Sequence, residues 1–342
     1  MVFLQTNFYS LSLTEERQAE HHLKSKVAQM MPSEFDDIAN EIFQYQYHYN
    51  PIYQQFCDSI TATAPWRKPP FYLPISAFKS NIVTTSASLP TFFFESSGTT
   101  GTTNSRHYLK DVAFYLQMSM KGFEFQYGKL SNYCILALLP HYLERQHSSL
   151  VEMVRFFISK SGNQHSGFFL HDTKKVYQIL QANKIAGTPT ILFGVSFALL
   201  DFVAEFQMDF PELIVMETGG MKGRREEMTR EELHFHIKKG FNIQSVHSEY
   251  GMTELLSQAW SKGDGIFTPS QTMKISIREA TDPFELEKQG KTGIIHIIDL
   301  ANIETCSFIA TEDLGIDLKS ENFLVQGRLD QADIRGCNLM FA

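Results

Sequence analysis

The sequence predicts an α/β protein in which a mostly parallel sheet is flanked by helices and followed by a β-rich C-terminal segment. Between residues 91 and 247, short apolar runs alternate with longer stretches of helical periodicity, a pattern typical of βαβ units. From residue 267 onward, strand-like runs follow one another without intervening helices. The chain has 342 residues, and 43% of them are hydrophobic, which is enough for a large core.

Composition narrows the classes of function. A net charge of -8 argues against a broad nucleic-acid surface, although a local cationic site stays open. No apolar run approaches about 18 residues, so we expect no membrane span, and residues 1–12 do not read as a signal peptide. The four cysteines have neither zinc nor disulfide spacing: Cys57, Cys134, Cys306 and Cys337. We therefore expect a cytoplasmic protein with reduced thiols.

Residues 1–75 are predicted to form a helical N-terminal region. One helix is expected at about Thr14–Met30, after a capping box at Ser12, and a second at about Glu34–Tyr47. The Pro-rich stretch Trp66–Pro74 is expected to be an extended connector.

Residues 76–265 are predicted to form an α/β core. The expected strands are Thr91–Glu95, Tyr133–Leu139, Gly167–Leu170, Thr190–Phe193, Leu213–Glu217 and Ile243–His247. The expected helices are Val112–Tyr127, Ser148–Ser159, Thr173–Ala182, Phe197–Phe206 and Arg230–Lys239.

Residues 266–342 are predicted to be β-rich. Strands are expected at Met273–Glu279, Gly293–Leu300 and Asn322–Arg328. Thr311–Gly315 (TEDLG) is interpreted as an acidic turn, and a second turn is expected around Arg328. Asp313 and Arg328 could together bond a ribose diol, although each alone is typical of an ordinary surface turn.

A stretch of small residues, SSGTTGTTNS, follows the first predicted strand and precedes a helix that Asp111 could cap. Backbone N–H groups and hydroxyls in such a loop can hold phosphate, and Arg106 and His107 could add positive charge. The stretch has no Walker motif. A flexible linker is the alternative interpretation.

Two more loops follow predicted strands, at Glu217–Arg225 and Ser248–Glu254. Ligands bind at the carboxyl ends of parallel strands, so we expect these loops and the Ser/Thr/Gly loop to converge. In YGMTE, Tyr250 could stack on a base, Thr253 could bond phosphate and Glu254 could bind Mg²⁺. A plain turn with a solvated Glu254 is the alternative.

These motifs carry a resemblance. In their order and spacing, SSGTTGTTNSRH, EYGMTE, GKTGIIHI, TEDLG and GRLDQADIRGCN resemble the core motifs of the adenylate-forming superfamily, which contains acyl-CoA synthetases, luciferases and peptide-synthetase adenylation domains. More closely, ESSGTTGTTNSRH, PHYLERQHSSLVEM, TGGMKGR and IRGCN resemble the acyl-protein synthetases of bacterial luminescence operons (LuxE type).

The resemblance implies roles for individual residues and a requirement for ATP and Mg²⁺. The loop that would wrap the ATP phosphates consists of Ser96, Ser97, Gly98, Thr99, Thr100, Gly101 and Thr102. The other implied ligands are Gly219 and Gly220 for the adenine or acyl pocket, Tyr250 with Gly251 for adenine, Thr253 for phosphate, Glu254 for Mg²⁺, and Asp313 with Arg328 for ribose. Cys337 stands where these synthetases have the cysteine that accepts the acyl group.

The chain departs from the superfamily pattern in two places. The phosphate loop has no lysine, for which Arg106 or His107 could substitute, and no lysine follows Arg328. The resemblance therefore implies the large N-terminal domain of adenylate-forming enzymes without the C-terminal lid domain and its lysine. A partner protein could supply the missing part.

The resulting functional hypothesis is an adenylate-forming ligase. It activates a carboxylic acid, expected to be a fatty acid, and transfers the acyl group to a thiol. Cys337, coenzyme A, or a carrier or reductase protein could be the acceptor, and no nucleic acid or membrane span is involved. Two alternatives are an acyl-CoA or aryl-CoA ligase that uses coenzyme A directly, and a nucleotide-binding protein that has lost adenylation.

Overall fold

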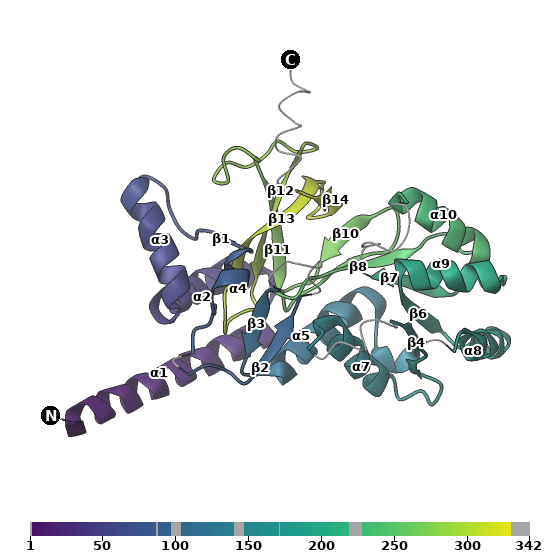
Figure 1. The fold of residues 1–342 in the computed structure, drawn as a ribbon, viewed down its shortest axis with the longest axis horizontal. Helices are drawn as coiled ribbons and strands as arrows, with labels where there is room; N and C mark the ends of the chain where they lie inside the picture. Colours follow the sequence, from purple (N-terminus) through teal and green to yellow (C-terminus); the bar gives the residue numbers. More distant parts are fainter. Residues whose placement is uncertain are drawn as a thin grey trace, which may run out of the picture. The chain divides into compact units, whose positions relative to one another are not determined.

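The structure is a computed structural model (Figure 1), and it describes residues 2–86, 88–96, 104–139, 147–170, 172–218 and 228–329, with side chains from residue 14 onward. These residues form an α/β protein, as predicted. The chain divides into two compact units. Unit 1 comprises residues 1–118, 253–257 and 271–342, and unit 2 comprises residues 119–252 and 258–270.

Unit 2 contains the parallel sheet, in the strand order β10-β9-β8-β7-β6-β4-β5. Its strands are β4 (Cys134–Leu138), β5 (Gly167–Phe168), β6 (Thr190–Val195), β7 (Ile214–Thr218), β8 (His247–Tyr250), β9 (Ala259–Ser261) and β10 (Ile266–Pro269). Strands β4 to β8 pair in parallel, whereas β9 and β10 add an antiparallel edge. The expected strand at Ile243–His247 is displaced, because β8 begins only at His247.

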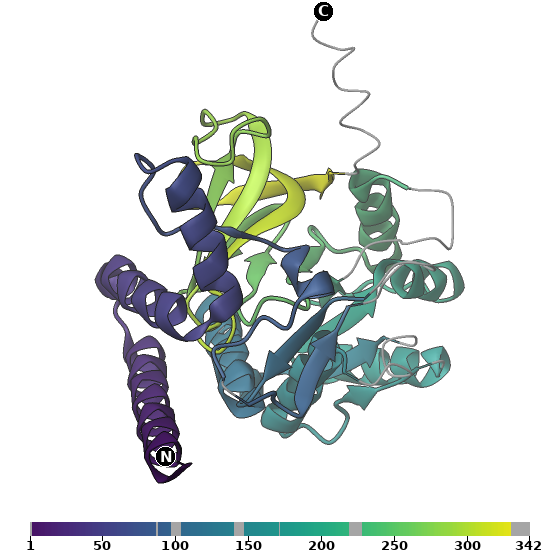
Figure 2. The same cartoon turned by 60° about the vertical axis from the view of Figure 1, so that its left-hand side comes forward.

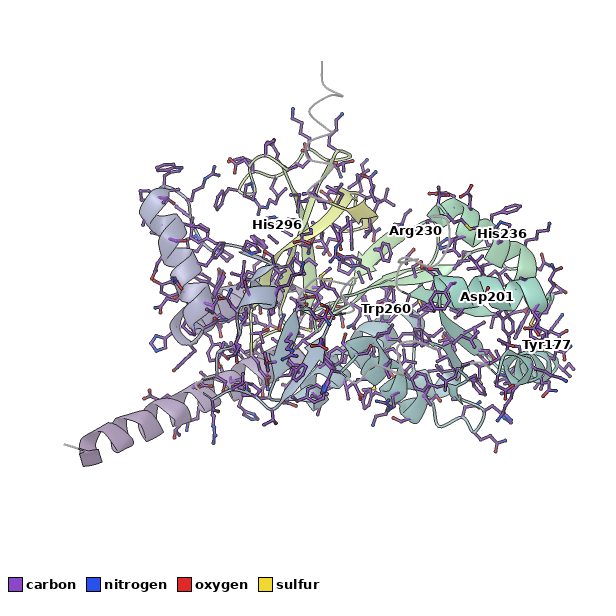
Figure 3. The ribbon with its side chains drawn as sticks, in the orientation of Figure 1. Tyr177, Asp201, Arg230, His236, Trp260 and His296 are labelled. Atoms are coloured by element: carbon purple, nitrogen blue, oxygen red, sulfur yellow. The ribbon has the colours of Figure 1, made fainter. Side chains whose placement is uncertain are left out.

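Helices flank the sheet of unit 2: α7 (Ser149–Ser161), α8 (Thr173–Ala186), α9 (Ser196–Glu205) and α10 (Arg230–Phe241), with the short η2 (Leu130–Asn132) before β4. Each predicted helix of this unit is confirmed to within a few residues. Thr229 and Glu232 form a capping box that begins α10. Trp260 of β9 is buried edge-on against Phe123, with 5.5 Å between the ring centroids (Figure 3).

Unit 1 begins with helices α1 (Val2–Gln29), α2 (Phe35–Tyr49), α3 (Pro51–Thr63) and α4 (Ala77–Ser80), with the short η1 (Pro32–Glu34) before α2. The α1 helix runs through Ser12, so the helix start predicted there is wrong. The α3 helix was not predicted, although Asn50 caps it by accepting a hydrogen bond from the Tyr53 N–H, with Pro51 at its first position. The division between the units falls within α5 (Val112–Tyr127), where Asp111 caps the helix as predicted.

The strands of unit 1 are antiparallel, apart from one short pairing. Strands β11 (Met273–Arg278), β12 (Thr292–Asp299), β13 (Phe308–Asp317) and β14 (Phe323–Arg328) follow in that order, and β1 (Leu73–Pro74) pairs in parallel with β13. A separate hairpin consists of β2 (Phe92–Glu95) and β3 (Arg106–Leu109). The acidic turn predicted at Thr311–Gly315 is wrong, because these residues lie in the middle of β13.

The described part of the chain includes no helix that is long and apolar enough to cross a membrane. In unit 2, buried apolar side chains of β4, β6 and β7 pack with those of α8, α9 and α10 into a core. Helices α9 and α10 lie side by side over this core (Figure 1). Gly240 permits their close approach, since a Cβ atom at this position would lie only 2.6 Å from Cβ of Val203.

Gly240→Ala tests this packing. Alanine normally favours a helix over glycine by about 1 kcal/mol, but here its methyl group would overlap Val203. Overpacking of this kind costs about 1–3 kcal/mol, so we expect a lower free energy of unfolding by urea titration. In the Val203→Gly background, which removes the overlapping Cβ atom, the same change should become neutral or stabilising. Equal destabilisation by Gly240→Ala in both backgrounds would contradict the proposed contact.

Candidate active site

The Ser/Thr/Gly loop joins the two strands of the β2–β3 hairpin in unit 1. Ser96 and Ser105 close its base, where the Ser96 N–H donates to the Ser105 carbonyl at 3.0 Å and the Ser105 N–H donates to Ser96 Oγ at 2.9 Å. The predicted strand–loop–helix order is therefore corrected, because β3 separates the loop from α5. RHYL alternates outward and inward side chains, a strand signal that the sequence interpretation passed over.

His107 is fully buried and supports the site from beneath. Its Nδ1 lies 2.8 Å from the Thr253 carbonyl oxygen, which can only accept, and its Nε2 lies 2.8 Å from Thr305 Oγ1 and 3.0 Å from Asn302 Oδ1. Burial lowers the pKa of His107 to about 4, so the ring is neutral near pH 7. The expectation that His107 supplies positive charge is therefore wrong.

Arg106 lies on the outer side of the same strand. Its Nε donates to Glu95 Oε1 at 2.9 Å, and its guanidinium carbon lies 4.9 Å from the centroid of the Phe93 ring. The side chain remains 52% exposed. Of the two cations predicted beside the loop, Arg106 is thus the one that keeps an accessible charge.

Glu254 is a buried carboxylate directly beneath the hairpin. Ser105 Oγ donates to Glu254 Oε1, and the residue is only 6% exposed. Burial raises the pKa of Glu254, and the positive charges of Arg328 and Lys79 oppose that shift. The alternative in which Glu254 is solvated is therefore excluded. The positive charges of Arg328 and Lys79 act on the buried Glu254 carboxyl group.

Asp313 and Arg328 face each other across two neighbouring strands. They are paired in register between β13 and β14, and Arg328 Nε lies 3.5 Å from Asp313 Oδ1. Arg328 is 51% exposed by side chain and Asp313 15%. The prediction brought these two residues together through turns, whereas the sheet register places them side by side.

The carboxyl ends of β7 and β8 form an edge in unit 2 where buried polar groups gather. Thr218 Oγ1 donates to Glu249 Oε2 at 2.8 Å, and Ser196 Oγ donates to Glu217 Oε1 at 2.7 Å. Burial raises the pKa of Glu249 to about 7; the Thr218 hydrogen bond opposes this shift, and the neighbouring Glu217 adds to it. This edge is where ligands bind in parallel sheets.

Tyr250 ends β8 at this edge, and Gly251 follows it. Tyr250 is 7% exposed, and its ring centroid lies 5.8 Å from that of Phe267. A Cβ atom on Gly251 would lie 2.3 Å from Glu249 Oε1, so a larger residue would displace that carboxylate. The glycine of the YGMTE motif therefore lets the Glu249 side chain keep its place in unit 2.

Several predicted site residues lie outside the described residues. They are the loop members Ser97, Gly98, Thr99, Thr100, Gly101 and Thr102, the pair Gly219 and Gly220, and Cys337. Among the described residues, the structure gathers Ser96, Arg106, His107, Thr253, Glu254, Asp313 and Arg328 in unit 1, and Tyr250 and Gly251 in unit 2. No group of three or more potential metal-ligating side chains occurs among the described residues.

The sequence analysis missed the groups that hold Glu254 and His107 in place. Asn302 Nδ2 donates to the Glu254 carbonyl at 2.7 Å, and Thr305 contacts the His107 ring. These residues belong to the run ANIETCS between two apolar strands, which has the composition of a solvated turn. The one available signal is its position between two strands that are themselves buried.

Comparisons with known proteins were made by sequence and by structure. No protein-family profile matches the chain, and no curated protein sequence matches it significantly. Solved structures do match.

The ATP-bound MatB of Rhodopseudomonas palustris is 17% identical with a TM-score of 0.51, over 69% of this chain and 47% of that chain. FadD1 of Archaeoglobus fulgidus, a long-chain-fatty-acid-CoA ligase, is 14% identical with a TM-score of 0.51, over 72% and 53%. MenE of Bacillus subtilis, an O-succinylbenzoate coenzyme A synthetase in complex with ATP and magnesium, is 17% identical with a TM-score of 0.51, over 69% and 49%.

These likenesses establish the fold. The matched structures are adenylate-forming enzymes, so the chain has the fold that its motifs predicted. The chain spans about half the length of the structures that it matches.

His107→Phe tests whether His107 is structural. The phenyl ring keeps the shape but leaves the Thr253 carbonyl without its His107 donor, at about 1–3 kcal/mol for a buried unsatisfied group. We expect a correspondingly lower free energy of unfolding by chemical denaturation. His236, which is exposed on α10 (Figure 3), is the matched control, and His236→Phe should change stability little.

The pH dependence gives a second readout. The folded-state pKa of His107 is about 4, against 6.5 for an unperturbed imidazole. The stability that depends on neutral His107 is therefore complete above about pH 6.5 and is lost as the pH falls through about 4. Wild-type stability should fall more steeply through this window than that of His107→Phe. Identical slopes would contradict the assignment.

Proposed function

We propose that this protein is an adenylate-forming ligase that uses ATP and Mg²⁺ to activate a carboxylic acid. The observation that carries the proposal is the buried Glu254 carboxylate, bonded to Ser105 at the base of the Ser/Thr/Gly loop and influenced by two cations. The fold adds support, because three enzymes of this kind share it.

Phosphate and metal would be held in unit 1. The loop after Ser96 would bind the ATP phosphates through backbone N–H groups and hydroxyls, and Thr253 would add a further contact. Glu254 offers the hard oxygen ligand that Mg²⁺ prefers, and the metal would neutralise phosphate charge. Arg106 would supply positive charge at the outer side of the loop.

The nucleoside would be bound by residues outside the Ser/Thr/Gly loop. Asp313 and Arg328 present an acceptor and a donor fork side by side, which suits the two hydroxyls of a ribose. Tyr250 would contact the adenine ring, next to Gly251, with Gly219 and Gly220 lining the adenine or acyl pocket.

The proposed reaction has two steps. A carboxylate oxygen of the acid attacks the α-phosphorus of ATP, and the bond from that phosphorus to the leaving pyrophosphate breaks. A thiolate sulfur then attacks the acyl carbon, and AMP leaves with the electron pair of the broken C–O bond. Catalysis in the first step rests on positioning and on neutralisation of phosphate charge.

The acceptor is proposed to be a cysteine of the chain itself, as in the acyl-protein synthetases, with a long-chain fatty acid as substrate and a cytoplasmic location. Cys57, Cys134 and Cys306 are buried, and burial raises the pKa of each thiol. A thiol with a raised pKa is rarely ionised near neutral pH, and because the thiolate is the reactive form, such a thiol is a poor nucleophile. Cys337 is therefore the proposed acyl acceptor, before transfer to a carrier or reductase protein.

A second candidate is an acyl-CoA ligase that uses coenzyme A directly. The observation in its favour is that the matched structures include a long-chain-fatty-acid-CoA ligase and a coenzyme A synthetase. Formation of an acyl-CoA product by protein that lacks Cys337 would select this candidate.

Glu254→Gln tests the adenylation step. With Mg²⁺ and a panel of fatty and aromatic acids, wild-type protein should catalyse acid-dependent exchange between ATP and labelled pyrophosphate. The amide keeps the Ser105 contact but binds Mg²⁺ poorly, so we expect a loss of about 10- to 100-fold in exchange rate. Glu321→Gln, on an exposed turn of unit 1, is the matched control. Exchange by Glu254→Gln at the wild-type rate would contradict the proposal that Glu254 binds Mg²⁺.

Cys337→Ser tests the transfer step. A radiolabelled acid with MgATP should label wild-type protein covalently, through a bond that hydroxylamine cleaves. The serine variant should lose this label and keep ATP–pyrophosphate exchange, because the first step does not use the thiol. Cys57→Ser controls for the loss of a buried thiol. Label retained on Cys337→Ser would contradict Cys337 as the acceptor.

A further inference from the structure

A pocket of about 500 Å³ opens beside the β2–β3 hairpin, wholly within unit 1. One wall is α4 with the residues that follow it, and the other is the base of the hairpin. In Figures 1 and 2 the short α4 helix lies next to these two strands. The lining residues are Phe78, Lys79, Ser80, Asn81, Ile82, Glu95, Asn104, Arg106 and Tyr108.

The pocket adjoins the Ser/Thr/Gly loop on both sides. Glu95 comes immediately before Ser96, where the loop begins, and Asn104 comes immediately before Ser105, where it ends. A ligand in the pocket would therefore lie next to the two ends of the loop, at Ser96 and Ser105.

The charge of the lining is positive, although the chain as a whole carries -8. Lys79 and Arg106 contribute two positive charges, and Glu95, which is paired with Arg106, contributes the one negative charge. The Lys79 ammonium makes no hydrogen bond or ion pair within the described residues, and the side chain is exposed. An anion is the ligand that such a lining favours.

The place of Lys79 is fixed by its neighbour. Phe78 is 2% exposed and lies edge-on to the buried His107 ring, with 5.6 Å between the ring centroids. The Phe78 N–H donates to the Ile75 carbonyl at 3.2 Å. These contacts attach α4 to the hairpin, so Lys79 stays beside the hairpin, where its charge also acts on Glu254.

We propose that this pocket is the subsite for pyrophosphate, the product of adenylation, with Lys79 as its principal cation. The inference rests on the proposed function, which generates pyrophosphate at the adjoining loop. Pyrophosphate carries about three negative charges near neutral pH and has no apolar part, which suits two cations with Asn81, Asn104 and Ser80 around them. Lys79 would thereby supply a positive charge that the loop itself lacks.

Calorimetric titration of inorganic pyrophosphate with Mg²⁺, without ATP or acid, tests the proposal. We expect Lys79→Ala to weaken binding about tenfold, the effect of losing one charge-assisted hydrogen bond. Lys79→Arg should keep most of the affinity. Lys291→Ala removes an exposed lysine of the same unit outside the pocket and should bind as the wild type does. Higher salt should narrow the difference between wild type and Lys79→Ala.

The outcomes separate this inference from the proposed function. Equal pyrophosphate affinity in Lys79→Ala and Lys291→Ala, or no binding by the wild type, would overturn the pocket assignment even if acid-dependent exchange is present. Weaker binding in Lys79→Ala alone would support the assignment even if no acid gave exchange, an outcome that would count against the proposed function. Matching thermal unfolding of the variants would show that each one folds.

Discussion

The candidate site depends on a buried polar loop, residues 299–307, between β12 and β13. The Asp299 carboxylate is fully buried and accepts hydrogen bonds from the N–H groups of Leu256, Ser257 and Ala301. Burial raises the pKa of Asp299, while these bonds oppose the shift. Buried polar groups are tolerated only when their partners are in place, so the loop dictates where the segment 253–257 must lie.

The same loop fixes the hairpin and the first helices. Asn302 holds the Glu254 carbonyl, and its neighbour Thr305 holds the His107 ring. Glu304 accepts from the N–H groups of Lys110 and Asp111 at the start of α5 and from the Lys24 ammonium of α1. Thus the hairpin that carries the Ser/Thr/Gly loop and the Glu254 segment, which are far apart in sequence, are held by one buried network within unit 1.

Much of the fold could be predicted, because strand and helix periods are strong where one face is buried. The helix 112–127 and the strand start at residue 273 agree with the structure. The strand β13 could not be predicted, since TEDLG is polar yet lies in a partly exposed strand whose register only the sheet decides.

The site could be predicted in part, for related reasons. Motif chemistry selected Glu254, Asp313 and Arg328, which the structure places in contact networks of unit 1. It assigned a positive charge to His107, because the sequence does not show that this residue is buried. Burial lowers the pKa of the ring and keeps it neutral. The proposed role of Lys79 has no counterpart in the sequence motifs, because the packing of Phe78 against His107 brings Lys79 to the hairpin.

The central claim is that this chain forms an acyl-adenylate. The most direct measurement is mass spectrometry of the small molecules that the protein produces from MgATP and a panel of carboxylic acids, in a single turnover without any added thiol. The account predicts an acyl-AMP from at least one acid, in an amount close to that of the protein and formed about 10- to 100-fold more slowly by Glu254→Gln. Protein that binds ATP but yields no acyl-AMP from any acid would contradict it.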